Sequence, residues 1–236
     1  MKISKYPNDS LPNKVKFGFT LAEVLITLGI IGVVAAMTIP VLITTHQQKV
    51  TVTKLERAIS VLNQAYRLSY DENGEASAQE AKTMGADEYF KKYWEPYVKI
   101  SNYCESYKDC GYDKSAPYKT PSGSFYGIAV NQSRAKFYTL DGFFYMILVD
   151  SGAGDNISLN TNIYLDLNGG EGPNIMGRDV FLLNRYIDDV KGGYVQPLCN
   201  NASDVVVNAN CTKTESSCCA EKIRRAGWKI EKDYPW

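Results

Sequence analysis

The chain has 236 residues, with 26 Lys and Arg against 26 Asp and Glu, a single His and six Cys. This length is typical of one or two modest domains. A hydrophobic content of 44% excludes a wholly disordered chain. Formal neutrality without a long basic block excludes a strongly electrostatic nucleic-acid binder, so we expect no nucleic-acid partner. With one His, a histidine-based active site is not expected.

Residues 1–18 are polar and show no apolar periodicity. Four lysines precede the next segment against a single acidic residue, Asp9, whereas the 20 residues after that segment carry both signs. Because the positively charged flank of a membrane segment stays inside, this bias predicts a cytoplasmic amino terminus and an extracytoplasmic remainder.

The second segment, residues 19–43, is apolar except for Glu23. Its last 20 residues are uncharged and would span about 30 Å as a helix, which is the thickness of a bilayer core. Its Leu, Ile, Val and Phe side chains favour insertion by about 6 kcal/mol, against about 3 kcal/mol for one acidic residue. We therefore predict a single membrane-spanning helix despite Glu23.

The stretch KFGFTLAEVLITLGIIGVVAAMTIP resembles the processing site and first helix of type IV pilins and type II secretion pseudopilins. Basic residues precede Gly18, Phe19 follows it, Glu23 is the fifth residue after Gly18 and Pro40 the twenty-second. A secretory signal is a poor fit, since its small-residue cleavage site would follow the apolar run instead of preceding it. The resemblance covers about residues 14–45.

The resemblance implies a processing site and a set of partners. Prepilin peptidase would cut between Gly18 and Phe19 and methylate the new amine of Phe19. Glu23 would pair with the amino-terminal amine of a neighbouring subunit during assembly. Copies of the chain, other pilins or pseudopilins, a platform protein and an assembly ATPase would be the remaining partners.

Glu23 and Pro40 are also notable without the resemblance. An ionisable residue in hydrocarbon is costly unless it has a partner, so Glu23 is a functional candidate. The alternative is that Glu23 lies at the membrane interface and pairs with nothing. Pro40 cannot donate to the Ala36 carbonyl and should kink or open the helix; an assembly role and a merely tolerated proline are equally compatible with this.

Beyond the membrane segment the sequence predicts an α+β fold. Apolar residues at helical spacing continue to the turn signal at 71–74, which predicts one long helix over residues 19–70. A second helix is expected over residues 77–97, with its aromatic residues in the core. About four antiparallel strands are expected from the β-branched and aromatic runs 124–131, 135–142, 143–150, 161–169 and 178–186, with a hairpin at Asp141-Gly142, and a short last helix is expected over 216–226.

The predicted organisation is therefore a leader at 1–18, a membrane half of the long helix at 19–43, its amphipathic half at 44–70 and an extracytoplasmic domain at 71–236. The amphipathic half should pack on the sheet.

All six cysteines lie after the membrane segment, as expected for disulfides in an oxidising compartment: Cys104, Cys110, Cys199, Cys211, Cys218 and Cys219. Adjacent Cys218 and Cys219 should not pair with each other, because their Cα atoms are only about 3.8 Å apart. If Cys104 pairs with Cys110, then Cys199 and Cys211 pair with Cys218 and Cys219 in one of two arrangements. Free thiols are the alternative, and the spacings do not fit zinc.

The segment 164–181 is the strongest candidate site outside the amino terminus. Asp166, Asn168 and Asp179, with Glu171 and Asn174 nearby, place oxygen ligands in a glycine-rich loop, as calcium requires. The spacing is not that of an EF-hand, and some pseudopilins bind calcium in a loop at a similar place. The alternative is a plain loop with Asx turns at Asp166 and Asn168. A phosphate-binding loop is rejected, because a strand pattern follows where a helix is needed.

No catalytic residue set emerges, so we expect a structural protein and not an enzyme. The sequence favours a pseudopilin or minor pilin over a major subunit, since the extracytoplasmic part is long and carries three candidate bridges. The alternative from another class is a signal-anchored extracytoplasmic binding module that does not polymerise.

Overall fold

A computed structural model describes residues 18–112, 118–126, 134–151, 158–159, 161–188 and 192–236. The chain divides into two compact units, Met1–Thr45 and His46–Trp236. We refer to the second as the globular unit. Residues 1–17 of the predicted leader lie outside the described residues.

Helix α1 runs without interruption from Leu21 to Asn73. This confirms the predicted long helix, which ends three residues beyond its expected end. Within the globular unit its buried side chains recur every three or four residues, which produces one apolar face: Val52, Leu55, Ala58, Ile59, Leu62, Ala65, Tyr66 and Ser69. Gly74, with φ of 69°, follows the last turn and allows the chain to leave the helix.

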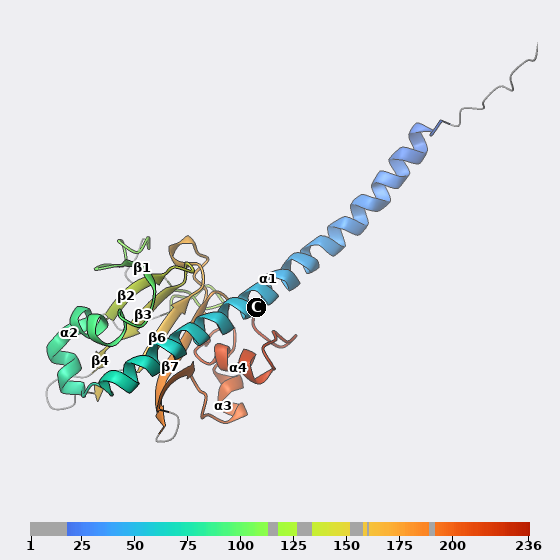
Figure 1. The fold of residues 1–236 in the computed structure, drawn as a ribbon. Helices are drawn as coiled ribbons and strands as arrows, with labels where there is room; N and C mark the ends of the chain where they lie inside the picture. The colour runs from blue at the N-terminus through green and yellow to red at the C-terminus, as the bar shows by residue number, and fades with distance from the viewer. Residues whose placement is uncertain (1–17, 113–117, 127–133, 152–157, 160, 189–191) are drawn as a thin grey trace, which may run out of the picture. The chain divides into compact units, whose positions relative to one another are not determined.

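The main sheet has six antiparallel strands in the order β1-β2-β3-β6-β7-β8 (Figure 1). Their bounds are β1 Ile100–Tyr103, β2 Arg134–Thr139, β3 Phe144–Leu148, β6 Asn162–Asp166, β7 Val180–Asp188 and β8 Gly192–Pro197. A separate two-stranded sheet pairs β4, Asp150–Ser151, with β5, Ser158–Leu159. The α+β class and antiparallel sheet are confirmed.

The sheet is wider than the four strands expected from the sequence, because β1 and β8 extend its two edges. The predicted hairpin is confirmed, since β2 and β3 pair around a turn in which Gly142 has φ of 81°. The predicted strand 124–131 falls partly outside the described residues. Its described part, residues 124–126, contributes only an isolated bridge between Phe125 and Lys119.

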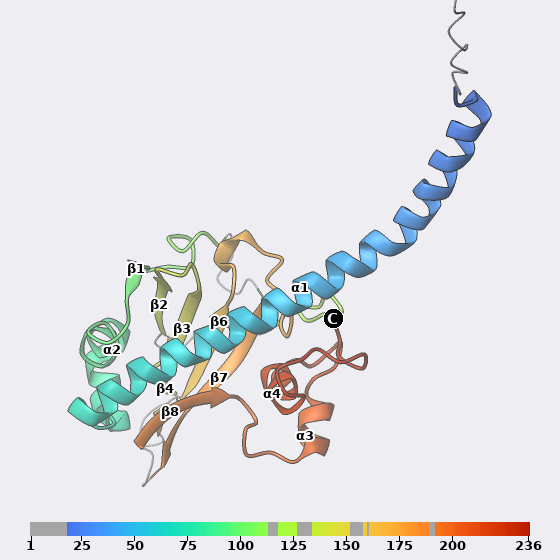
Figure 2. The ribbon, with the colours of Figure 1, turned by 45° about the vertical axis from the view of Figure 1, so that its right-hand side comes forward.

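Both faces of the sheet are covered, which explains why every residue of β3 is buried. Tyr145 and Ile147 face the larger core, beneath α1, α2 (Ala78–Tyr93) and α4 (Cys219–Arg225). Figure 2 shows α1 lying across this face of the sheet. Phe144, Met146 and Leu148 face a second core formed with aromatic and sulfur side chains from residues 104–118. Alternating side chains of one apolar strand therefore fill two cores.

Four aromatic residues of the second predicted helix are buried in the core, as expected, whereas Tyr97 is only partly buried. The helix itself ends at Tyr93, four residues before its expected end. Tyr89, Phe90 and Trp94 are fully buried, and Trp94 stacks on Tyr66 of α1 with ring centroids 5.5 Å apart. Ser77 caps the helix by accepting the backbone N–H of Glu80.

Three disulfides stabilise the region after the long helix. Cys104 pairs with Cys110, Cys199 with Cys218 and Cys211 with Cys219. In the last two disulfides, Cys218 and Cys219 at the start of α4 pair with cysteines on either side of α3, Asp204–Ala209. The predicted disulfide-stabilised carboxyl-terminal region is thus confirmed, and the structure selects one of the two orders left open.

The outer edge of β8 is occupied by a side chain of α1. The Asn63 amide nitrogen donates to the Val195 carbonyl oxygen at 2.7 Å, and the Val195 backbone N–H donates to the Asn63 amide oxygen at 2.6 Å. Asn63 therefore satisfies both backbone groups of Val195 as a neighbouring strand would. The next outward position, Pro197, has no N–H to offer.

Candidate functional site

The predicted processing residues lie directly before α1. Gly18 has open space around the position that a Cβ would occupy, and Phe19 is 90% exposed. Helix α1 begins two residues after Phe19. In the structure this short segment is accessible, as cleavage by a peptidase would require.

Thr20 and Glu23 form a capping box at the start of α1. The Thr20 backbone N–H and its hydroxyl each donate to Glu23 Oε2 at 2.8 Å, and the Glu23 backbone N–H donates to the Thr20 hydroxyl oxygen at 3.2 Å. Two otherwise unpaired backbone donors of the first turn are satisfied in this way. Glu23 Oε1 makes no hydrogen bond within the described part of the chain and remains available to a partner.

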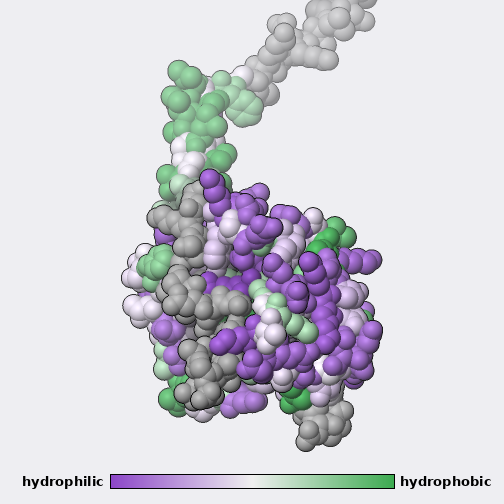
Figure 3. Space-filling model, turned by 90° about the vertical axis from the view of Figure 1, so that its left-hand side faces the viewer, coloured by the Kyte–Doolittle hydropathy of each residue, from purple (hydrophilic) through white to green (hydrophobic). Residues whose placement is uncertain are grey.

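The apolar stretch after Glu23 exposes its side chains in every direction. Figure 3 shows the hydrophobic colour on this first half of α1, whereas the face of the globular unit in view is mostly hydrophilic. An 18-residue window in this helix has a mean hydropathy of 2.5 and is not buried, so the helix is long and apolar enough to cross a membrane. Such an exposed apolar surface is typical of a membrane or protein contact.

The hydroxyl groups in this stretch are satisfied within the helix itself. Thr27, Thr38 and Thr44 each donate to the carbonyl oxygen four residues earlier, at 2.9, 3.0 and 2.9 Å. Such bonds let threonine enter hydrocarbon without an external partner. Glu23 differs from them, because its charge is not neutralised by any described residue.

Pro40 lies inside α1, and the helix continues through it. The Pro40 carbonyl oxygen accepts a hydrogen bond from the hydroxyl of Thr44, one turn later in the helix. The role of Pro40 in assembly stays a prediction.

The predicted calcium residues come together at one end of β6 and β7. Asp166 is fully buried; its Oδ2 accepts the Tyr112 hydroxyl at 2.8 Å, and its Oδ1 accepts the Asn168 backbone N–H at 3.2 Å. Asp179 accepts the backbone N–H groups of Asn174 and Ile175 at 2.8 and 2.6 Å. The second of the Asp166 bonds is the Asx turn of the plain-loop alternative.

Burial dominates the acid–base behaviour of this loop. Desolvation, and then the neighbouring Asp179 carboxylate, raise the pKa of Asp166 to about 8. Burial also raises the pKa of Asp179, although its backbone hydrogen bonds act against this. At neutral pH Asp166 is therefore mostly protonated unless a cation compensates its charge.

One observation fits a cation in the loop. The buried Asn168 Oδ1 has no hydrogen-bond partner among the described residues. The Asn174 amide needs no cation, because its nitrogen donates to Gly169 O at 2.9 Å and to Asp166 Oδ2 at 3.2 Å. Glu171 is exposed and does not join them. Within the described residues no group of three or more His, Cys, Asp or Glu could hold a metal. Calcium binding stays a prediction.

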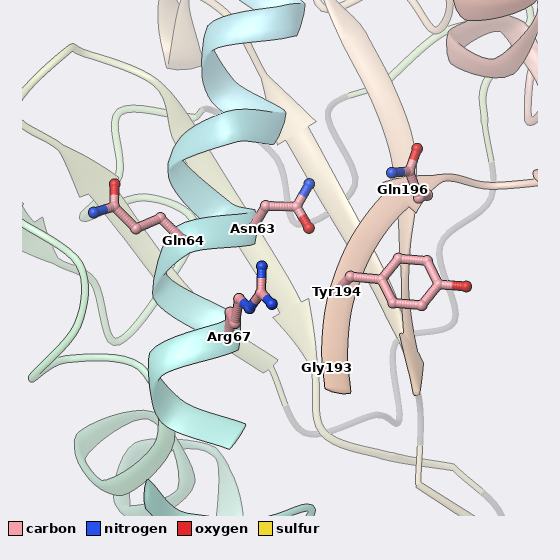
Figure 4. A pocket seen from close by; sticks show the side chains of 6 residues that line it. All are labelled: Asn63, Gln64, Arg67, Gly193, Tyr194 and Gln196. Carbon is pink, nitrogen blue, oxygen red and sulfur yellow. The ribbon is translucent and has the colours of Figure 1, made fainter. Parts of the chain in front are cut away.

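A pocket of about 480 Å³ lies between α1 and the β8 edge (Figure 4). Asn63 extends from α1 toward β8, whereas Gln64 extends from the other side of the helix. Arg67, Gly193 and Tyr194 also line this pocket. It contains amide, guanidinium and phenol groups, and among its lining residues there is no Ser, Cys or His to act as a nucleophile or base.

Two family comparisons match the chain. Residues 13–39 match the prokaryotic N-terminal methylation motif, which supports the type IV pilin-like cleavage segment. Residues 41–236 match a family of unknown function, DUF6613. The chain belongs to this family. Searches of curated proteins and of solved structures gave no match.

The two matches cover different parts of the chain, and only the first indicates a class of protein. The methylation motif identifies a pilin-like or pseudopilin class through the leader and the first half of α1. The rest of the chain, which includes the globular unit, follows the family of unknown function. The class that the methylation motif supports is a structural one.

Sequence reasoning missed two features of the site. The capping box has a local signal, since Thr20 and Glu23 have the Thr-x-x-Glu spacing that is its signature. Asn63 could not be found, because its role depends on the placement of β8 beside α1.

Proposed function

We propose that the chain is a pseudopilin or minor pilin, a structural subunit that prepilin peptidase processes between Gly18 and Phe19 and that assembles through the first half of α1. In this proposal the globular unit is extracytoplasmic, and α1 holds the subunit in the cytoplasmic membrane until it enters a pilus or pseudopilus. A platform protein and an ATPase supply the work of assembly.

The observation that carries the proposal is that Glu23 has a carboxylate oxygen without a partner among the described residues. It is the one ionisable side chain in an exposed apolar stretch, one of its oxygens is held by Thr20 and the other has no described partner. An unpaired carboxylate in hydrocarbon costs several kcal/mol. A cationic amine from another processed subunit would offset this cost, so assembly is favoured where Phe19 of one copy meets Glu23 of the next.

The capping box makes the interaction directional. Thr20 orders the first turn and fixes Glu23 Oε2, so Oε1 presents a single acceptor at a defined height on the helix. Each copy then carries one donor, the amine at Phe19, and one acceptor one turn later. Such a contact can repeat head to tail along an open filament.

The test is Glu23→Gln in the native cell, with Glu56→Gln as the matched control. Gln preserves the capping box but has no charge, and Glu56 is an exposed residue of the same helix. Both variants should insert and be cleaved, which mass spectrometry of the amino terminus shows as a chain that begins at N-methylated Phe19. Only Glu23→Gln should lose subunits from filaments recovered by shearing or cross-linking.

The rival is a signal-anchored binding module that never polymerises. It predicts that Glu23→Gln inserts at least as well as the wild type and that no cross-linked ladder of subunits forms in either. A retained leader, or a cut beyond Ile43, would contradict the pilin-like proposal directly. Abundance in the sheared fraction, compared with confinement to membranes, would separate a surface pilus subunit from a pseudopilin or minor component.

A further inference from the structure

The last turns of α1 expose one face that carries a leucine and two carboxylates. Leu68 is 49% exposed, and Asp71 and Glu72, three and four residues later, are exposed as well. Residues at this spacing lie on the same side of a helix, so the three side chains form one surface, which we call the acidic face. Neither carboxylate makes an ion pair within the described residues, although Arg67 lies one turn before Asp71.

The position of these two carboxylates is unfavourable in a single chain. The last carbonyl groups of a helix carry partial negative charge, which disfavours acidic side chains there and favours basic ones. Helix α1 ends at Asn73, and its last turn contains no basic residue. Asp71 and Glu72 therefore lie where a cation from another molecule would stabilise them.

A pocket of about 410 Å³ farther back along α1 carries the opposite kind of charge. Lys54 of α1 and Arg178 of the loop between β6 and β7 line it, and neither makes an ion pair within the described part of the chain. The carboxylate in the same wall, Asp179, is already bonded by the backbone N–H groups of Asn174 and Ile175. We call this site the basic pocket.

The basic pocket also matches the acidic face in its apolar part. Val50, Leu167 and Pro173 form an apolar wall in the same pocket as the two cations. On the acidic face, Leu68 is the apolar side chain beside the two carboxylates. A contact between the two surfaces would thus bury apolar groups against each other and place opposite charges together, as stable interfaces do.

The two surfaces cannot meet within one chain. Lys54 and Asp71 belong to the same uninterrupted helix and are about 26 Å apart along its axis, at 1.5 Å per residue. Figure 1 shows the same separation, since the carboxyl terminus with Trp236 of the pocket lies beside α1 far from the end of α1 near α2. A contact between them must therefore join two copies head to tail, and such a contact can repeat along a filament.

We propose that the acidic face of one copy binds the basic pocket of the next copy. Asp71 and Glu72 then pair with the cations of the pocket, and Leu68 contacts its apolar wall. Every residue of the contact belongs to the globular unit, so the placement of the first half of α1 does not enter. The inference rests on the proposed function, because it names the contact between globular units that accompanies assembly through the start of α1.

The first test is disulfide cross-linking of the full chain in the native cell. A chain with both Val50→Cys and Leu68→Cys should give a ladder of covalent oligomers on oxidation, because each copy then offers one thiol to each neighbour. The two positions are about 27 Å apart in one chain, which is too far for an internal disulfide. Either substitution alone should give no ladder.

The second test reverses charges in the chain that carries both cysteines. Lys54→Glu with Arg178→Glu should reduce the ladder roughly tenfold, because two exposed ion pairs become repulsive. Asp71→Lys with Glu72→Lys should reduce it equally, and all four substitutions together should restore it. Restoration excludes misfolding as the cause of the loss. Lys49→Glu is the matched control, because Lys49 is exposed on the same helix and does not line the pocket.

Three results would overturn the inference: no ladder from the chain with both cysteines, an equal loss in Lys49→Glu, or a charge exchange that does not restore the ladder. The last would mean that the cations contact a different partner, such as a lipid or another protein. Filaments that depend on Glu23, recovered from the same cells, separate the two proposals. Such filaments without a ladder contradict this contact alone, whereas the absence of both contradicts the proposed function as well.

Discussion

The buried carboxyl group of Asp166 should make the globular unit less stable as pH rises. Its pKa is raised from 3.8 to about 8 in the folded chain, so between these values the folded state binds the proton more tightly than the unfolded state. The contribution of this carboxyl group to stability is therefore fully present below about pH 4 and is lost as pH rises through about 8. Each pH unit between these two pKa values removes about 1.4 kcal/mol of stability, with a total of about 6 kcal/mol.

The perturbation is Asp166→Asn. Asparagine has nearly the same shape and can accept the Tyr112 hydroxyl, but it does not ionise. We expect the variant to lose most of the dependence on pH between 5 and 8 and to be more stable than the wild type at pH 8. The measurement is urea unfolding of the full chain in detergent with a calcium chelator, followed by near-ultraviolet circular dichroism at several pH values.

Asp109→Asn is the control, because Asp109 is exposed and bonds to Ser106 lower its pKa. It should leave the slope above pH 5 unchanged. Because burial also raises the pKa of Asp179, a shallower slope should remain in Asp166→Asn. The reasoning would be refuted by a wild type equally stable at pH 5 and pH 8, or by a slope as steep in Asp166→Asn as in the wild type. Since a domain of this kind is stabilised by only about 5–15 kcal/mol, the effect should be readily measurable.

Three further predictions concern the same unit. Calcium added at pH 8 should raise the urea midpoint of the wild type but not of Asp166→Asn; an unchanged midpoint would assign the loop to Asx turns alone. Leu62→Ala should lower the free energy of unfolding by about 2–5 kcal/mol, measured by the same unfolding, because Leu62 is fully buried, whereas the exposed Leu68→Ala should change it by less than about 0.5 kcal/mol. Replacing Cys211 and Cys219 together by Ser should cost about 2–4 kcal/mol, and an unchanged midpoint would mean that this disulfide contributes nothing.

The elements that the sequence predicted are those with a strong local pattern. The helical spacing after Thr44 required one long helix, and the apolar run of β3 with Asp141-Gly142 required a hairpin. The edge strands left weaker signals: β8 begins with two glycines and ends with a proline, and β1 has four residues. Their strand conformation depends on pairing with β7 and β2, which is a tertiary effect.

The candidate site shows the same limit. Glu23 could be identified from sequence because a lone charge in an apolar run requires an explanation. The order of the cysteine pairs could not be identified, since spacing allowed both orders until α3 and α4 were placed. Local sequence patterns thus indicated which single residues have a chemical role. Which residues lie next to them depends on the fold and could not be predicted.

The bonds of Asn63 to Val195 have a consequence for copies of the chain at high local concentration. An open sheet edge is a template on which an identical chain can add its own strand, and crowding in two dimensions would favour such adhesion. Here a helix side chain occupies the central position of that edge, and Pro197 follows it. The chain is thus protected from β-aggregation at this position of β8, and under the proposed function assembly uses the start of α1 instead.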